Sequence, residues 1–300
     1  MTTTASERTS HRPPHPLGRQ RPANPAVRAF ITGFGVLFLV ATLVWFSLNA
    51  GLSGPRWHTS TLGSSESMDG VEQVRVSSSR ANVTVSDTSN PGLTWTATMP
   101  GDPANMEANS VVRSGGTLTI EPEAARRIWF LTGFSWGWDE SGTLDVAVPS
   151  APELDLHIST RAGDANAGGT WDEVVVTSGV GDVILGVSAR SMDIRAGVGD
   201  IRGSVNVDGG PLTINGGVGD ISLTISGGIP SAVDVTAGVG DVALNLPPTT
   251  HGYVVTGDAG AGGRTNLLPA PDPDGIPVSA PVRVKVSSGV GSVVLGTSGS

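Results

Sequence analysis

The 300-residue chain contains no cysteine, and this absence removes several classes of structure and chemistry. A disulfide framework, a cysteine nucleophile, zinc held by thiolates and lipid attachment to a cysteine all require this residue. Any folded part of the chain must therefore be stabilised by its apolar core and its hydrogen bonds.

Charged residues are also scarce: they make up 15% of the chain, and Lys285 is the single lysine. Glycine, in contrast, is abundant at 42 residues. Each interior glycine lowers helix stability by about 1 kcal/mol relative to alanine, whereas valine, isoleucine and threonine favour strands. We therefore expect the bulk of the chain to be β-structure.

The charge that is present is distributed unevenly. Residues 1–28 hold five arginines and one glutamate, a net charge of +4, and the remaining 13 basic and 26 acidic residues give −13. Nucleic-acid phosphates bind basic patches, so we expect no nucleic-acid partner. Residues 1–28 are also rich in proline, serine and threonine without apolar periodicity, which predicts a disordered basic tail.

The sequence has one long apolar run, "AFITGFGVLFLVATLVWFSL" from Ala29 to Leu48. Twenty uncharged residues at 1.5 Å each span a bilayer core of about 30 Å, which predicts a transmembrane helix over 29–50. A cleavable signal peptide has a shorter apolar region, followed by a small-x-small site that is not found here. A buried globular helix would need helical partners, and nothing nearby in the sequence reads as one. An uncleaved anchor is therefore favoured over both. The positive-inside rule places residues 1–28 in the cytoplasm and the remainder outside the cytoplasmic membrane.

A repeat dominates the second half of the chain. The stretch "TSGVGDVIL" (177–185) returns as "RAGVGDIRG", "NGGVGDISL", "TAGVGDVAL" and "SSGVGSVVL". Apolar residues occupy alternate positions on both sides of each corner, which indicates strand, glycine-rich corner, strand. The repeated aspartates are Asp164, Asp182, Asp200, Asp220 and Asp241, and Ser292 takes the aspartate position in the last repeat.

A single pair of short strands cannot bury its apolar face, but stacked pairs can. The sequence thus predicts an all-β fold, either a β-solenoid-like stack of strand-turn-strand repeats or a tightly wound β-sandwich built from the same hairpins. We place this domain at 70–296, after a linker at 51–69 and before a short polar tail at 297–300. Residues 267–281, with five prolines, predict a loop ejected from the stack.

The corners themselves suggest a structural role for each residue. The glycine pairs allow positive φ and close stacking, the intervening Val180, Val198, Val218 and Val239 are expected to point inward, and each aspartate is expected to cap its turn. The glycines concerned are Gly179, Gly181, Gly197, Gly199, Gly217, Gly219, Gly238 and Gly240.

Fainter repeats precede these corners. Residues 74–87, "VRVSSSRANVTVSD", have the same form with Asn82 in the aspartate position, and 111–122, "VVRSGGTLTIEP", resemble a hairpin.

Calcium is the main alternative to a purely structural role for the aspartates. Exported Gly-Asp repeats of nine residues bind Ca²⁺, but this period is about twenty residues with one aspartate, and Ca²⁺ takes six to eight oxygen ligands. Stacked aspartates would lie about 5 Å apart, which makes the column a weak Ca²⁺ candidate at most. We expect no cofactor, with a Ca²⁺-stabilised surface adhesin as the alternative.

Catalysis has little support in the sequence. His58, His157 and His251 stand alone, and no Ser/His/Asp grouping or metal-ligand spacing occurs. We therefore assign no catalytic residue and expect no enzyme, with a glycan-active β-helix enzyme as the least favoured reading.

An aromatic cluster within residues 126–140 breaks the repeat pattern. It is either a hydrophobic cap for the stack or a contact patch for a protein, a glycan or the outer leaflet. The cluster consists of Trp129, Phe130, Phe134, Trp136 and Trp138.

A short basic tail, one apolar helix, "VRVSSSRANVTVSD", "LDVAVPSAPELDLHISTRAGDANAGG" and serial "SGVGDVIL"-like units together resemble the bacterial putative-adhesin family of β-strand repeats, also called toastrack-like domains. The resemblance covers residues 70–296 and rests on structural motifs. It implies a β-solenoid-like fold on the outer face of the cytoplasmic membrane. It also implies a link with cell-envelope stress systems. Taken as a whole, the sequence predicts a non-enzymatic interaction, scaffolding or stress-sensing module of the cell envelope, with an envelope protein or glycan as partner.

Overall fold

A computed structural model describes residues 59–100, 110–122, 142–151, 153–250, 252–271 and 282–298. Every helix or strand in these ranges is a β-strand, as the composition predicts. They include no helix with the length and apolarity needed to cross a bilayer, and the predicted segment 29–50 lies outside them. The aromatic residues of 126–140 also lie outside the described residues.

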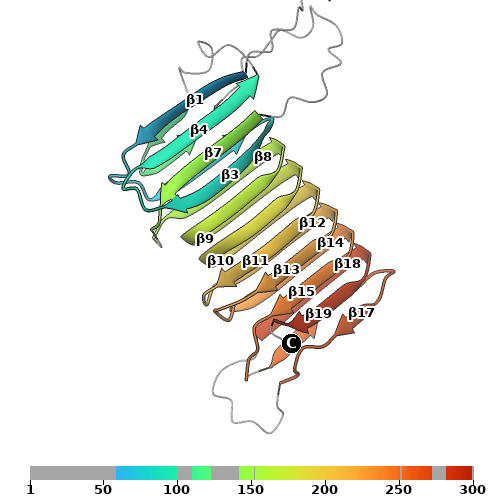
Figure 1. Cartoon of the computed structure of the whole chain (residues 1–300). Coiled ribbons are helices and arrows are strands. Elements are labelled where there is room, and N and C mark those ends of the chain that lie inside the picture. The colour runs from blue at the N-terminus through green and yellow to red at the C-terminus, as the bar shows by residue number, and fades with distance from the viewer. Residues whose placement is uncertain are drawn as a thin grey trace, which may run out of the picture. The chain divides into compact units, whose positions relative to one another are not determined.

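The repeating unit is one coil of a stack, made of a strand, a glycine corner and a second strand (Figure 1). β9 (Ala165–Val180) and β10 (Val183–Val198) show the arrangement: Val183 is in register with Ala165, and Ile194 with Val176, one coil apart. The pairing is parallel, because the same position of successive repeats is brought side by side. Parallel coils decide between the two predicted architectures in favour of the solenoid.

Strands that lead into the corners form a first sheet. Its order is β5 (Val111–Ser114), β6 (Thr117–Ile120), β2 (Gln73–Ser78), β8 (Asp155–Ala162), the second halves of β9 and β10, β12 (Pro211–Val218), β14 (Ala232–Val239), β18 (Val282–Val290) and β16 (Tyr253–Thr256). All these pairs are parallel except the predicted hairpin β5–β6.

Strands that leave the corners form a second sheet. Its order is β1 (Thr59–Glu66), β4 (Leu93–Pro100), β7 (Gly142–Pro149), β3 (Ala81–Thr88), the first halves of β9 and β10, β11 (Ile201–Val207), β13 (Ile221–Ile225), β15 (Val242–Leu246), β19 (Val293–Thr297) and β17 (Arg264–Asn266). β1 starts within the stretch expected as a linker, so the strands begin before the repeat pattern is readable.

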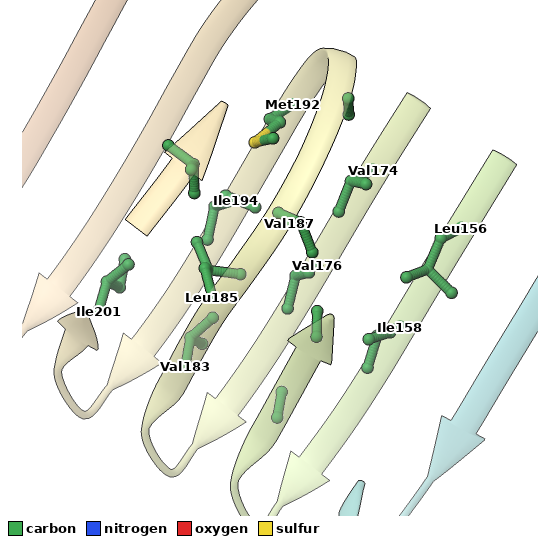
Figure 2. Packing of buried hydrophobic residues seen from close by; sticks show 14 of the residues in the cluster. Leu156, Ile158, Val174, Val176, Val183, Leu185, Val187, Met192, Ile194 and Ile201 are labelled. Carbon is green, nitrogen blue, oxygen red and sulfur yellow. The ribbon is translucent and has the colours of Figure 1, made fainter. Parts of the chain in front are cut away.

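β9 and β10 bend and contribute to both sheets, so the 19 strands make one hydrogen-bonded network. The inward side chains of the two sheets form one continuous apolar cluster (Figure 2). In β10, for example, Leu185 and Ile194 are almost fully buried, whereas Gly186 and Arg195 face outward. This alternation of buried and exposed residues accounts for the period-two pattern in the sequence.

The repeat length varies at the edge opposite the corners. β10 runs through that edge without interruption, residues 208–210 connect β11 to β12, and residues 226–231 connect β13 to β14. The corner spacing lengthens from 18 to 20 and then 21 residues in the same order. We call this side the variable edge, and the side that carries the glycine corners the corner edge.

Both ends of the stack depart from chain order. The coil β2–β3 lies between β6–β7 on one side and β8–β9 on the other, although β6 and β7 come later in the sequence than β3. Likewise, β18–β19 lies between β14–β15 and the coil β16–β17. The last two strands of the chain are therefore enclosed within the stack.

The sequence did not reveal β16 and β17, which lie in the 51-residue gap between the last two corners. Of the predicted loop 267–281, residues 267–271 contain no strand, in agreement with their prolines, and residues 272–281 lie outside the described ranges. Leu268 is nevertheless buried, and the backbone N–H of Leu267 donates to the carbonyl of Leu295. The start of this loop thus packs on β19, the strand that contains Leu295.

Candidate functional site

The corners stack along one edge and provide the most regular surface of the described residues. In the corners that contain Gly-Val-Gly, the two glycines are required for different reasons. Gly181 adopts a φ of +138°, a region that side chains disfavour. Gly179 has no positive φ, but a Cβ there would lie 2.5 Å from the carbonyl oxygen of Arg161 in the preceding coil. The prediction of positive φ is thus confirmed for the second glycine and wrong for the first. The first position needs glycine because the neighbouring coil lies too close to leave room for a Cβ.

The aspartates form a hydrogen-bonded ladder that runs from coil to coil. The backbone N–H of each aspartate donates to Oδ1 of the aspartate one coil earlier, at 2.9 Å for Asp182, Asp200 and Asp220 and at 2.8 Å for Asp241. Oδ1 of Asn82 accepts from the backbone N–H of Asp164 at the start of the ladder, so the asparagine in the fainter repeat takes the same place as the aspartates. We call Asn82, the five aspartates and Ser292 the aspartate ladder.

The predicted capping role therefore needs a correction in its geometry. Each carboxylate accepts a hydrogen bond from the aspartate of the next coil and not from its own turn. The backbone N–H of that next aspartate lies at the bend, where it has no partner in a neighbouring strand. The adjacent backbone groups are already engaged: Gly181 donates to the carbonyl of Val198, and Val183 to that of Asp200, both in the following coil. The carboxylate thus supplies the acceptor that the parallel ladder lacks at the bend.

The ladder ends at Ser292. Its backbone N–H and its hydroxyl both donate to Oδ1 of Asp241, at 2.7 and 2.9 Å. These two hydrogen bonds lower the pKa of Asp241, and the bond from the backbone N–H has the larger effect. In the next coil, β16–β17, Gly263 occupies the ladder position, because Arg264 is in register with Val293 and the backbone N–H of Val293 donates to the carbonyl of Gly263.

The corner valines point outward, and the prediction that they point inward is wrong. Val180 is 56% exposed and Val218 51%, although alternation along the strand would place both inside. The alternation ends at the preceding small inward residues, such as Ser178 and Ala196, after which the chain turns. The valines are in register one coil apart and form a column, which we call the valine ridge: Val180, Val198, Val218, Val239 and Val290.

Charge around the ridge is mainly negative. Arg202 pairs with Asp182 and lies 3.7 Å from Asp200, and Arg161 occupies the position of Gly179 one coil earlier. Within the described residues, no arginine or lysine pairs with Asp220 or Asp241. The ridge is therefore flanked by acidic groups that are least neutralised toward its C-terminal half.

The ladder does not resemble a metal centre. No three His, Cys, Asp or Glu residues in the described part of the chain are grouped so that they could hold an ion. One oxygen of each ladder aspartate is occupied by a backbone N–H, and only one carboxylate is contributed per coil. This donor set falls short of the six to eight oxygens that Ca²⁺ takes.

Other ionisable groups lie away from the corner edge. His157 lies on the outer side of the first sheet, 3.1 Å from Gln73 through its Nε2; partial burial and then the charge of Arg75 lower its pKa. At the variable edge, Arg190 binds Asp172 of the preceding coil through two hydrogen bonds of 2.7 and 2.9 Å. That hydrogen bonding lowers the pKa of Asp172. His58 and His251 lie outside the described residues.

Sequence reasoning identified the aspartates and glycines but missed the valine ridge and Arg202. The signal for the ridge was present in the valine that stands between two glycines in five successive corners, since a core position would not require the same side chain in all five. Arg202 could be found only from the register, because it belongs to the coil after Asp182.

Comparisons with known proteins give only distant matches. No protein-family profile and no curated protein matches the chain. Among solved structures, a "putative adhesin" from Parabacteroides distasonis has a TM-score of 0.40 at 16% identity, with 80% of this chain and 98% of that chain covered. A "putative cell adhesion protein" from Clostridium sporogenes has 0.39 at 9% identity, covering 80% and 100%. A "putative lipid binding protein" from P. distasonis has 0.37 at 11% identity, covering 80% and 97%.

Proposed function

We propose that the chain is a single-pass membrane protein of the bacterial cell envelope whose β-stack lies outside the cytoplasmic membrane and binds other envelope components without catalysing a reaction. In this proposal residues 29–50 anchor the chain and the basic tail stays in the cytoplasm. It also assigns the chain to the toastrack-like adhesin family that its repeats resemble. Scaffolding and stress sensing are the roles compatible with such a placement.

The valine ridge is the observation that supports a binding role. Five apolar side chains, each about half exposed, repeat in register along one edge of a scaffold whose backbone is fixed by parallel pairing on both sheets. Apolar side chains gathered into one exposed column mark interaction sites more often than singly scattered ones. A rigid repeated surface suits recognition of an extended partner.

A non-enzymatic role is supported by what the corner edge offers chemically. Its carboxylates are engaged by backbone N–H groups, and its valines and glycines provide no nucleophile, acid or base. His157, the one histidine in the described ranges, contacts Gln73 on another face. Reaction chemistry would need convergent groups within hydrogen-bond reach of a substrate.

The proposed placement is tested by protease digestion of intact spheroplasts that express the full chain with a tag at each end. We expect the C-terminal tag to be removed and the N-terminal tag to stay protected and to sediment with the membrane. Protection of both tags, or release of the chain by alkaline carbonate washing, would contradict the proposal. A signal-peptidase product lacking the N-terminal tag would contradict the uncleaved anchor.

The binding role is tested by chemical crosslinking in the same cells. We expect crosslinked species to be lost when Val218 and Val239 are both changed to threonine, and to persist in a variant with two outward residues of the first sheet altered, Thr213→Val and Thr236→Val. Equal crosslinking by both variants would show that the ridge is not the contact surface.

A Ca²⁺-stabilised adhesin is the alternative, and thermal unfolding of the full chain distinguishes it. We expect the same midpoint in millimolar Ca²⁺ and in chelator, because the ladder hydrogen bonds need no cation. A midpoint several degrees higher with Ca²⁺ would establish a metal site by mass action and favour the alternative.

A further inference from the structure

We propose that the corner edge binds a basic amphipathic α-helix of a partner protein, with the apolar side of the helix on the valine ridge and its lysines or arginines against the aspartate ladder. The inference rests on the proposed binding function and specifies the class of partner.

The ridge provides a continuous apolar seat. Each valine stands between two glycines, as Val180 does between Gly179 and Gly181, so no side chain within the corner shields it. Val198 is 49% exposed and Val290 55%, which shows that this exposure holds along the ridge. A partner can therefore pack against the sides as well as the tips of the valines.

The electrostatics select a basic partner. The aspartate ladder runs parallel to the ridge, two residues further along each corner, and Asp220 and Asp241 have no cationic partner in the described ranges. On the other side of the ridge, Arg195 is already paired with Asp193 at 2.5 Å. Cationic groups of the partner are therefore expected on the ladder side.

The spacing of the valines selects a helix. Successive parallel strands lie about 4.8 Å apart, so the ridge presents one valine per 4.8 Å. An α-helix presents its apolar stripe once per 5.4 Å turn, whereas an extended strand presents same-face side chains about every 6.6 Å. A helix along the ridge loses register by only about 0.6 Å per coil, and about 13 residues at 1.5 Å each cover its five valines.

Two other occupants fit less well. A second copy of this chain would bring two acidic ladders together, and residues 29–300 carry a net charge of −13. An anionic bilayer surface would be repelled by the same carboxylates.

The test uses the full-length chain in a nonionic detergent and a synthetic 14-residue helical peptide. The peptide has leucine and alanine on one face, lysine on the adjoining face, a fluorophore at one end and a central benzophenone. A matched peptide carries glutamate in place of every lysine. Fluorescence anisotropy measures affinity, and photocrosslinking followed by peptide mapping locates the contact.

Two double variants separate apolar contact from charge. Val218→Thr with Val239→Thr preserves side-chain shape and strand propensity but removes apolar surface. Asp220→Asn with Asp241→Asn removes charge while retaining the oxygen that accepts the ladder hydrogen bond, as Asn82 does in the natural ladder. Because all four residues are outward-facing, unchanged thermal midpoints serve as the folding control.

We expect the basic peptide to bind and to crosslink within the corners at 180–241, with affinity lowered about tenfold in each double variant. We also expect binding to weaken with salt and the glutamate peptide not to bind. The proposal would be overturned if wild type and both variants bound the peptide with equal affinity. It would also be overturned if the glutamate peptide bound equally well, or if the crosslinks were confined to other faces. So would ridge-dependent dimerisation of the chain, or ridge-dependent binding to phosphatidylglycerol vesicles, without peptide binding.

These outcomes are distinguishable from failure of the proposed function. If the peptide does not bind while ridge-dependent crosslinking in spheroplasts persists, the binding function stands and the helical partner is wrong. If both are lost, the ridge is not an interaction surface.

Discussion

Oδ1 of Asp220 accepts the backbone N–H of Asp241 in the following coil at 2.8 Å. This contact joins residues 21 positions apart in sequence but at equivalent positions of adjacent corners, so it records the register of the stack in a single hydrogen bond.

Removing that acceptor should loosen the stack. We expect Asp220→Ala to lower the free energy of unfolding by about 1 kcal/mol, because the N–H of Asp241 loses its partner. Asp220→Asn should have little effect, since the amide oxygen can accept the same bond. Urea denaturation of the three proteins measures the difference. Equal destabilisation by Ala and Asn would mean that charge, not the hydrogen bond, is what matters.

The second glycine of a corner should tolerate no side chain. Gly199 has a φ of +138°, and a Cβ there would collide with the carbonyl of Gly181. We expect Gly199→Ala to destabilise the fold by about 2 kcal/mol or more. Gly186 is the matched control, because a Cβ there would lie 3.9 Å from its nearest neighbour, the carbonyl oxygen of Ala167. Gly186→Ala should be neutral or slightly stabilising, and similar losses in both variants would refute the corner geometry.

The same substitution at two valines tests their orientation. Val176 is fully buried and Val198 is 49% exposed. Val176→Thr places a hydroxyl in the apolar core and should cost about 1–3 kcal/mol, whereas Val198→Thr should change stability by less than about 0.5 kcal/mol. Thermal melts of the two variants give the comparison. A larger loss for Val198→Thr would restore the inward orientation predicted from alternation.

The single tyrosine offers a spectroscopic prediction. The hydroxyl of Tyr253 donates to the carbonyl of Pro247 at 2.5 Å, and burial raises the Tyr253 pKa to about 12. Because the unfolded chain ionises near pH 10, the folded state should lose stability as pH rises from 10 toward 12. Absorbance titration at 295 nm should show a midpoint near 12 that returns to about 10 in denaturant. A midpoint near 10 in the native protein would place the hydroxyl in solvent.

Tyr253→Phe isolates the hydrogen bond of that side chain. We expect it to lower the free energy of unfolding by about 1 kcal/mol while leaving the apolar packing intact. The loss of stability between pH 10 and 12 should disappear at the same time. Its persistence in the Phe variant would assign it to other groups.

Deleting the final coil should expose the coil outside it. Without residues 282–300, β16 and β17 lose β18 and β19, the strands with which they pair. We expect backbone amides of 253–256 and 264–266 to exchange rapidly with deuterium in the truncated chain. Amides of β9 and β10, several coils away, should keep their protection, because each coil contacts its neighbours. Retained protection at 253–256 would contradict the enclosed position of β18.

The repeats were readable in the sequence because their physics is local. Alternation before and after Asp182 and the glycines around Val180 indicated strand, corner and strand. The need to bury one face predicted that these units stack, but it left a solenoid and a sandwich of hairpins open until the parallel pairing was seen. The orientation of Val180 was not readable, since alternation is broken by the turn itself. Nor was the acceptor role of Asp182, because the N–H it serves belongs to Asp200 in the next coil and depends on register.

The ends of the stack depended on long-range pairing. Residues 253–266 keep only the Gly-x-Gly of the corner motif, at Gly260 and Gly262, with alanine in place of the valine and Gly263 in place of the aspartate, so β16 and β17 do not stand out in the sequence as a coil. β18 lies between β14 and β16, although β16 comes before β18 in the sequence. No local sequence pattern indicates such a change of order.

The two edges of the stack differ in how they can change. Residues 208–210 and 226–231 add length at the variable edge, yet the ladder bonds at the corresponding corners stay between 2.8 and 2.9 Å. Added residues at the variable edge thus leave the spacing of the corner edge unchanged. Descendants of this chain could diversify one edge by lengthening its loops while the opposite edge keeps a constant spacing, so that new specificities arise without altering an existing one.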